Sequence, residues 1–187
     1  LPRSFTTFCF QYLCNKVNYV VRKSLDNAVQ MEYKALTDDM TGAYNKNRLI
    51  ELLNNRERDG QDIAVIYWDV NQLKYVNDNW GHLCGDRLIT EVAKSIQSIA
   101  REEDIVIRYG GDEFLLYVAN GTKEIAEQLI EAWKVRLEEE KKRENYEFPV
   151  SASVGYALGK HSQLKDIIVA ADKDMYANKR IRRESAK

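Results

Sequence analysis

A four-residue turn signature, Gly110-Gly111-Asp112-Glu113, lies between two short runs of β-favouring residues within residues 105–118. Two glycines between such runs are typical of a β-hairpin, because glycine accepts tight-turn backbone angles and lets the chain approach a bulky ligand closely. A third apolar run, residues 63–68, has the length of a buried strand and is followed at once by Asp69. If the hairpin pairs beside this strand, Asp69 and Asp112 converge.

The rest of the pattern predicts helices that alternate with these strands. Apolar periodicity and turn residues predict five helices and one more strand region: residues 10–35, 43–56, 86–101, 122–143 and 164–180, and residues 148–158. This alternation favours an α/β, or α+β, domain with helices on a mainly antiparallel central sheet. The 187 residues suffice for one domain and an extension, which we expect at residues 37–187 and 1–36.

The extension carries a seam of small and apolar residues at alternating spacings of four and three, from Phe10 to Ala35. Ser24 is the one polar residue of the seam. This spacing is typical of a coiled-coil stripe. Because the residues are small and the heptads few, a dimerising helix and a helix packed on its own domain remain equally open.

Composition excludes several classes of protein. With 44% apolar and 30% charged residues, the chain has the composition of a globular protein. Its net charge of -1 gives no positive electrostatic field that would drive unspecific binding to a nucleic acid polymer. No apolar run approaches the roughly 18 residues of a membrane span. Cys9, Cys14 and Cys84 form no CxxC pair, and His82 and His161 are far apart, so neither a zinc site nor a disulfide framework is expected.

Asp69 and Asp112 have the chemistry of a metal site. Two carboxylates and a backbone carbonyl leave open positions on a hard divalent cation such as Mg²⁺, which binds few protein oxygens together with substrate phosphates. Such an arrangement favours phosphoryl transfer. Each piece alone also has a purely structural interpretation, in which Asp69 caps a turn and the glycine-rich sequence is only a hairpin loop.

Taken together, the motifs of this chain resemble those of the GGDEF-domain family of bacterial diguanylate cyclases. The resemblance spans residues 38–183, and the motifs follow the family's order and approximate spacing. They are residues 39–45 (DMTGAYN), 69–78 (DVNQLKYVND), 81–86 (GHLCGD), 108–114 (RYGGDEF) and 153–155 (SVG), and Ala171-Asp172 with Tyr176 and Lys179.

This resemblance implies a fold similar to the palm of polymerases and nucleotide cyclases, and synthesis of cyclic di-GMP from two GTP with release of two pyrophosphates. Two domains would face each other in a homodimer, so that each 3′-hydroxyl attacks the other α-phosphate. Two Mg²⁺ or Mn²⁺ ions per active site would be held by Asp69, the Val70 carbonyl and Asp112. Glu113 would be a further ligand or the proton acceptor, and whether Asp112 or Glu113 accepts the 3′-hydroxyl proton stays open.

The resemblance further implies the residues that bind GTP: Asn77, His82, Asp86, Lys74, Lys179, Arg183, Gly110 and Gly111. The Asp86 carboxylate can accept hydrogen bonds from guanine N1–H and N2–H₂, which adenine lacks, so GTP is favoured over ATP. Without the resemblance, Asn77-Asp78 is interpreted as an ordinary turn, and His82 can equally be a turn residue. Lys179 and Arg183 would then only complement the helix dipole.

Arg101-Glu-Glu-Asp104 matches the family's RxxD inhibitory site, at which cyclic di-GMP would act as a product inhibitor; the alternative is a surface ion pair. The sequence also departs from the family. Asn71 and Leu73 replace a frequent Asp and Phe, and Arg182 replaces a usual glycine. We expect Asn71 and Leu73 to tune activity and not to remove it, whereas Arg182 bears on the phosphate role of Arg183.

We therefore expect a cytoplasmic diguanylate cyclase under the control of an upstream sensor domain, in a fragment that lacks this sensor and any membrane anchor of its parent. The alternative is a catalytically weak module that acts as a receptor for cyclic di-GMP, through Arg101 and Asp104, or for GTP, through Asn77 and Asp86. An enzyme that makes another nucleotide is disfavoured by Asp86.

Overall fold

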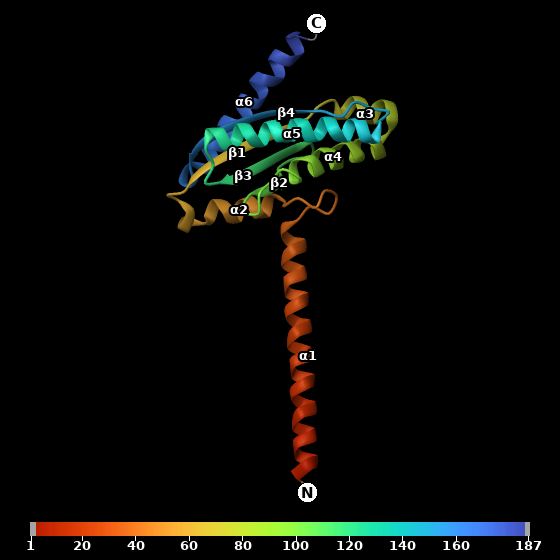
Figure 1. Cartoon of the computed structure of the whole chain (residues 1–187), viewed down its shortest axis with the longest axis vertical. Helices are drawn as coiled ribbons and strands as arrows, with labels where there is room; N and C mark the ends of the chain where they lie inside the picture. Colours follow the sequence, from red (N-terminus) through yellow and green to blue (C-terminus); the bar gives the residue numbers. More distant parts are fainter. Residues whose placement is uncertain (1–2, 186–187) are drawn as a thin grey trace. The chain divides into compact units, whose positions relative to one another are not determined.

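A computed structural model describes residues 3–185, with side chains over residues 10–13 and 15–181. The chain divides into two compact units after Leu36. The first unit is one helix, α1 (Arg3–Leu36), drawn in red and orange in Figure 1. Among the described residues, no helix is both long and apolar enough to cross a membrane.

Helix α1 contains the helix predicted for the N-terminal extension, and its apolar seam faces solvent. Phe10, Val17, Val21 and Met31 of this seam are between 50 and 73% exposed. The side chain of Cys14, in the same seam, lies outside the described residues. The other described side chains of α1 up to Ala35 are exposed as well, so exposure alone does not distinguish this seam from the other faces of the helix.

The second unit is built on a four-stranded antiparallel sheet, which confirms the expected fold class. Its order is β2 (Ile105–Arg108), β3 (Glu113–Ala119), β1 (Asp62–Val70) and β4 (Ala152–Lys160). The central strand β1 pairs with β3 on one side and β4 on the other. The predicted hairpin is therefore β2–β3, and it lies directly beside β1.

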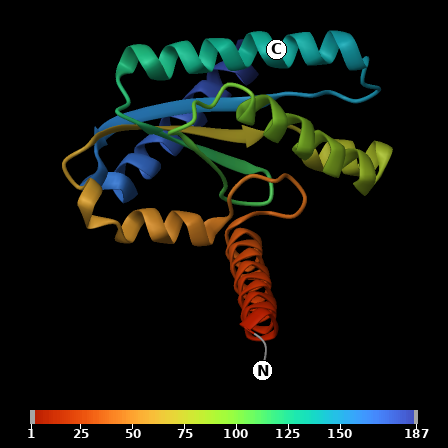
Figure 2. The same cartoon turned by 60° about the horizontal axis from the view of Figure 1, so that its bottom comes forward.

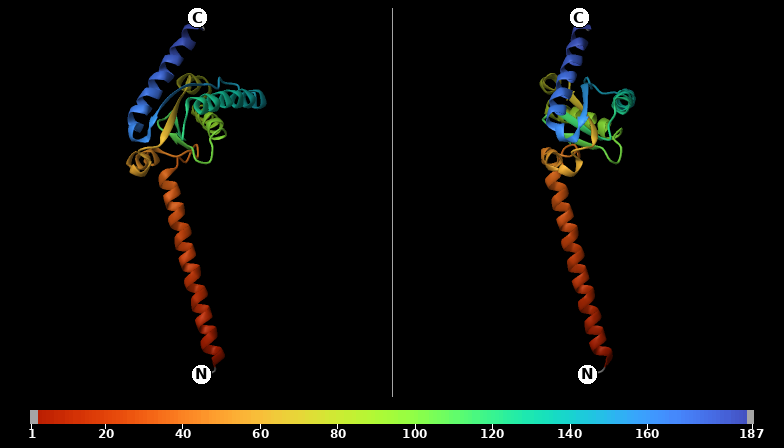
Figure 3. Two further views of the ribbon diagram at one scale, coloured as in Figure 1. Left: turned by 60° about the vertical axis from the view of Figure 1, so that its left-hand side comes forward. Right: turned by 90° about the vertical axis from the view of Figure 1, so that its left-hand side faces the viewer.

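Five helices surround this sheet: α2 (Lys46–Asn54), α3 (Leu73–Trp80), α4 (His82–Gln97), α5 (Lys123–Glu144) and α6 (Leu164–Ser185). Two short 3-10 segments are η1 (Arg56–Arg58) and η2 (His161–Gln163). Helices α4 and α5 cover one face of the sheet, and α2 and α6 cover the other. Figure 2 shows α5 and α2 on opposite sides of the sheet, and Figure 3 shows the same for α5 and α6.

Alternation along β1 decides which face each side chain enters. Ile66 and Trp68 belong to the core under α4 and α5, where the Trp68 ring packs edge-on against Trp133 at a centroid distance of 5.7 Å. Tyr67 belongs to the core under α2 and α6. Asp69, two residues further along β1, shares the face of Tyr67 and is directed toward α6.

Three local predictions were wrong. Asp69 does not follow the strand but lies inside β1, because backbone pairing continues to Val70. The sequence analysis missed helix α3, which contains Asn77-Asp78, the pair that without the resemblance is interpreted as an ordinary turn. The helix predicted from residue 43 begins at Lys46, because Asn45 caps it by accepting a hydrogen bond from the backbone N–H of Asn47 at 2.8 Å.

Helix α6 approaches the sheet closely at Gly155. A Cβ atom at this position would lie 2.0 Å from the backbone nitrogen of Met175. Two α6 side chains also bind the edge strand: Asp174 accepts from the Tyr156 backbone N–H at 3.0 Å, and Asn178 donates to the Val154 carbonyl at 3.1 Å. These contacts fix α6 against the end of β4 and β1.

Candidate active site

Two of the predicted carboxylate residues, Asp69 and Glu113, lie opposite each other where β1 ends beside the β2–β3 hairpin. Asp69 is the register partner of Glu113, and the Val70 backbone N–H donates to the Asp112 carbonyl at 2.9 Å. Cross-strand partners place their side chains on the same face of a sheet. The structure therefore brings Asp69 and Glu113 together, with Val70 and Asp112 joined through their backbones. Glu113 is the first residue of β3, and not part of the hairpin tip as predicted.

Asp69 has a cationic partner, Lys179 of α6. Asp69 Oδ1 accepts a hydrogen bond from Lys179 Nζ, and the two side chains are only 21 and 17% exposed. Lys179 was predicted to contact the triphosphate, and the structure places it on a predicted metal ligand. A positive charge thus already lies beside this carboxylate.

The donor set fits a hard divalent cation. Asp69, Asp112 and Glu113 offer carboxylate oxygens and Val70 a carbonyl, which are the ligands that Mg²⁺ and Mn²⁺ prefer. Among the described residues no three His, Cys, Asp or Glu side chains form a ready cluster. These donors lie at the end of β1 and at the start of β3. A hard cation that binds few protein oxygens keeps positions for phosphates.

Glu113 is held by the residues around it. Its Oε1 accepts a hydrogen bond from the Tyr67 hydroxyl at 2.7 Å, and its Oε2 lies 2.3 Å from where a Cβ on Gly110 would be. Its carbonyl accepts from the backbone N–H groups of Tyr109 and Gly110, at 2.8 and 3.2 Å. Burial and the hydrogen bond to Glu113 raise the pKa of Tyr67, so its hydroxyl keeps its proton and donates.

Arg108 ties the hairpin tip to the start of the domain. Its Nη1 donates to both carboxylate oxygens of Asp38, at 3.0 and 3.1 Å, and its Nη2 donates to the Gly111 carbonyl at 2.7 Å. Burial acts to raise the pKa of Asp38, but hydrogen bonds from Thr41 and Arg108 outweigh it and leave that pKa below its ordinary value. The charged pair therefore persists at neutral pH and fixes the loop that carries Asp112.

The predicted guanine-binding residues lie on α3 and α4. Asn77 Oδ1 is buried and has no hydrogen-bond partner in the described part of the chain. Gly85 makes room for it, because a Cβ there would lie 1.9 Å from this oxygen. Asp86 is exposed on the same helix as Gly85. A buried polar atom without a partner is costly, and this oxygen lies against Gly85.

The remaining predicted substrate residues are dispersed. Lys74 is exposed on α3, and His82 is exposed at the start of α4. Gly111 is exposed at the hairpin tip, and a Cβ there would meet no described atom within 4 Å. The side chain of Arg183 lies outside the described residues.

Arg101 and Asp104 form an ion pair with each other. Arg101 donates from Nε and Nη2 to the two Asp104 oxygens at 2.9 and 2.7 Å, and Asp104 Oδ1 also accepts from the Ala119 backbone N–H at 3.2 Å. The Asp104 side chain is 0% exposed, whereas that of Arg101 is 32% exposed. In this conformation Arg101 can reach a ligand and Asp104 cannot.

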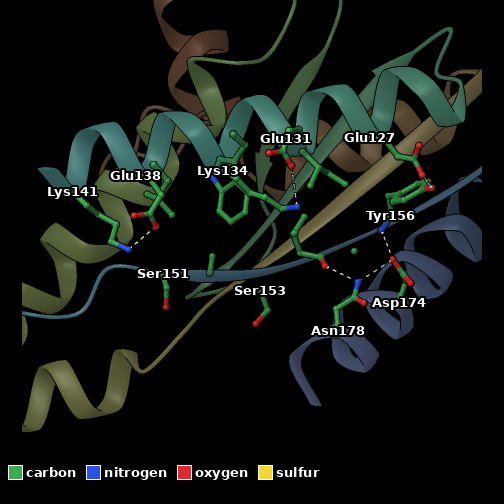
Figure 4. Close-up of a pocket in the computed structure, with 16 residues that line it drawn as sticks. Glu127, Glu131, Lys134, Glu138, Lys141, Ser151, Ser153, Tyr156, Asp174 and Asn178 are labelled. Carbon is green, nitrogen blue, oxygen red and sulfur yellow. Dashed lines mark hydrogen bonds and ion pairs between the residues drawn. The ribbon is translucent and has the colours of Figure 1, made fainter. Parts of the chain in front are cut away.

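Asn71, where the family frequently has Asp, binds β4 through both ends of its amide. Its Nδ2 donates to Ser151 Oγ at 3.3 Å, and its Oδ1 accepts from Ser153 Oγ at 2.9 Å. Both serines line a cavity of about 680 Å³ between α5, β4 and α6, shown in Figure 4. In Figure 4, Lys134 pairs with Glu131 and Lys141 with Glu138, while Glu127 accepts from the Tyr156 hydroxyl. The lining contains no predicted site residue. The two serine bonds of Asn71 therefore tie the turn after β1 to the start of β4.

Sequence reasoning missed Tyr67, Asp38 and Arg108. Arg108 has a signal, since it is the first residue of the RYGGDEF motif. Asp38 has none in its immediate sequence, because its partner lies 70 residues away. Tyr67 lies within an apolar strand pattern, where an aromatic residue is expected for packing alone.

The chain matches the family described as "Diguanylate cyclase, GGDEF domain" over residues 35–185. It is 35% identical over 148 residues to the probable diguanylate cyclase DgcJ of Escherichia coli K12, covering 77% of this chain and 29% of DgcJ. It is 34% identical over 149 residues to the cyclic di-GMP phosphodiesterase PdeR of the same organism, covering 78% of this chain and 22% of PdeR. The chain thus spans less than a third of these curated relatives.

A solved structure is also similar. The GGDEF domain of DgcB from Caulobacter crescentus, in complex with c-di-GMP, superposes with a TM-score of 0.66 at 28% identity and covers 78% of this chain and 91% of that one. The expected similarity to the cyclase palm fold is confirmed by this match.

Proposed function

Because the chain belongs to the GGDEF-domain family of diguanylate cyclases, we propose that its second unit condenses two GTP into cyclic di-GMP and releases two pyrophosphates. The single observation that carries this proposal is the pairing of Asp69 with Glu113 beside the backbone bond between Val70 and Asp112. That pairing supports an edge of oxygen ligands at which a triphosphate can bind.

The proposed ligands of two Mg²⁺ or Mn²⁺ ions are Asp69, Asp112 and the Val70 carbonyl, with Glu113 as a further ligand or as proton acceptor. When bound, such cations neutralise charge on the triphosphate and make the 3′-hydroxyl a better nucleophile. Lys179, now on Asp69, is proposed to turn to the phosphates when GTP binds, together with Arg183 and Lys74. The exposed backbone at Gly111 leaves room for the phosphates to approach, and the partly buried Gly110 precedes it in the same loop.

Guanine selection is assigned to Asn77 and Asp86, with His82 beside them. The unpartnered Asn77 oxygen can accept a hydrogen bond, and the exposed Asp86 carboxylate can accept from guanine N1–H and N2–H₂. Adenine offers no such pair of donors. A site built to bind these groups rejects a base that leaves its own polar atoms unpaired.

Catalysis requires two domains, since each half-site holds one GTP and its 3′-hydroxyl must reach the α-phosphate of the other. The exposed seam of α1 supports a homodimer that raises the effective concentration of two half-sites. Control by an upstream sensor would act through α1. Because GTP is a cytoplasmic nucleotide, the proposal places this domain in the cytoplasm.

The alternative proposal is a receptor module without turnover, and the similarity to a protein named as a phosphodiesterase keeps it in view. The intact carboxylates Asp69, Asp112 and Glu113 favour the cyclase. Incubation with Mg²⁺ and either GTP or ATP, followed by chromatography, separates the proposals. We expect cyclic di-GMP from GTP and no cyclic dinucleotide from ATP; tight binding of cyclic di-GMP without turnover would favour the receptor.

Product inhibition is proposed to act through Arg101. We expect Arg101→Ala to raise the cyclic di-GMP concentration needed for half-inhibition at least 10-fold, because the exposed guanidinium can bind a phosphate or a guanine edge. Loss of the Arg101 side chain leaves the buried Asp104 carboxylate without its cationic partner, which costs about 3 kcal/mol of stability. Inhibition is therefore also measured in the double variant Arg101→Ala, Asp104→Ala. Equal half-inhibition in parent and both variants would refute the site.

A further inference from the structure

We propose that Tyr67 is a positioning residue of the cyclase reaction: its hydroxyl holds the Glu113 carboxylate against Gly110, in the orientation that the reaction uses. This inference rests on the proposed function. It concerns a residue inside a strand, on the face of the sheet that α2 and α6 cover.

The hydrogen bond between Tyr67 and Glu113 is well defined. The hydroxyl donates to Oε1 at 2.7 Å, from a residue that is 3% exposed. The Tyr67 ring is held by its edge-on contact with Tyr109, at a centroid distance of 6.0 Å. Tyr109 in turn binds the Glu113 carbonyl through its backbone N–H. Ring, backbone and carboxylate are therefore fixed relative to one another.

Gly110 restricts the same carboxylate from the other side. Oε2 of Glu113 occupies the space of a Cβ at position 110, at 2.3 Å from its ideal position. With Oε1 bound to Tyr67 and Oε2 over Gly110, the carboxylate has one orientation beside Asp69. A carboxylate fixed in this way loses little further freedom when it binds a cation or accepts a proton.

The ring of Tyr67 packs in the core, and its hydroxyl makes the bond to Glu113. A buried hydroxyl destabilises the fold unless it has a hydrogen-bond partner, and an apolar side chain would fill the core equally well. Tyr117 provides the comparison. It lies in the same core and is 1% exposed, and its hydroxyl shares a hydrogen bond of 2.9 Å with His161 Nδ1. Like Tyr67, it carries a buried hydroxyl with a hydrogen-bond partner, but that partner is not a predicted site residue.

The first test compares Tyr67→Phe with Tyr117→Phe. Both remove one buried hydroxyl and should lower Tm similarly. We expect Tyr67→Phe to lower kcat for cyclic di-GMP about 10-fold or more with KM for GTP unchanged within twofold, since residues that orient a ligand typically have effects of this size. Tyr117→Phe should keep parental kcat. Equal kcat in both variants would overturn the proposal.

A second test needs no activity. Tyr67→Phe and Glu113→Ala remove the same hydrogen bond. In the unliganded protein, the sum of their two Tm losses should therefore exceed the Tm loss of the double variant. Strictly additive losses would overturn the proposal. If the parent itself makes no cyclic di-GMP, the proposed function fails, and the Tm comparison still decides whether Tyr67 holds Glu113.

Discussion

Replacing Asp112 with alanine is expected to abolish cyclic di-GMP synthesis, with a loss of about 1,000-fold, and to leave the fold intact. The fold uses the backbone carbonyl of Asp112, which accepts from the Val70 N–H at 2.9 Å, and alanine keeps that carbonyl. The carboxylate, which is only partly buried, is what the variant removes. Chromatography of the products formed from GTP measures the loss, and thermal unfolding checks the fold.

Glu102→Ala is the matched control, because Glu102 is an exposed carboxylate that precedes the same hairpin. It should retain parental activity. Unchanged turnover by Asp112→Ala would remove Asp112 from the catalytic site. A parallel collapse of the thermal transition would instead mean that the loop needs this side chain for its structure.

Gly155→Ala is expected to produce the largest loss of stability, about 3 kcal/mol or more. The new Cβ would lie 2.0 Å from the Met175 nitrogen and 2.6 Å from its Cα, and backbone cannot yield as a flexible side chain does. Helix α6 would have to move away from the sheet. Because α6 carries Lys179, this displacement should also separate Lys179 from Asp69 and lower the activity of the protein that remains folded.

Gly60→Ala is the control for this variant. A Cβ at Gly60 would meet no described atom within 4 Å, so the free energy of unfolding should change by less than about 0.5 kcal/mol. Both variants are compared by urea denaturation. A Gly155→Ala protein as stable as Gly60→Ala would show that α6 does not require the close approach.

Sequence patterns predicted the framework of the site because local signals mark its parts. The turn glycines locate the β2–β3 hairpin, and the apolar run before Asp69 locates β1. Antiparallel pairing of β1 and β3 then brings Asp69 to Glu113. The hairpin and β1 each follow from residues close together in the chain, and periodicity detects such features. Their pairing joins distant residues and was a condition of the sequence analysis.

The features that sequence patterns did not predict depend on contacts between distant residues. Helix α3 has eight residues and contains Asn77-Asp78, a pair typical of turns, so no local signal distinguishes it from a loop. The bond from Tyr67 to Glu113 joins residues 46 apart, and Lys179 lies 110 residues from Asp69. Such pairs depend on the register of the sheet and on the approach of α6, which one sequence does not contain as a pattern.

The most direct measurement of the central claim is the rate of cyclic di-GMP and pyrophosphate formation from GTP and Mg²⁺ over a series of concentrations of this chain. We predict that both products form and that the rate per protein molecule rises with protein concentration, because two half-sites must meet. No cyclic di-GMP at any concentration would contradict the cyclase assignment, and a rate per molecule independent of concentration in a monomeric protein would contradict the two half-sites.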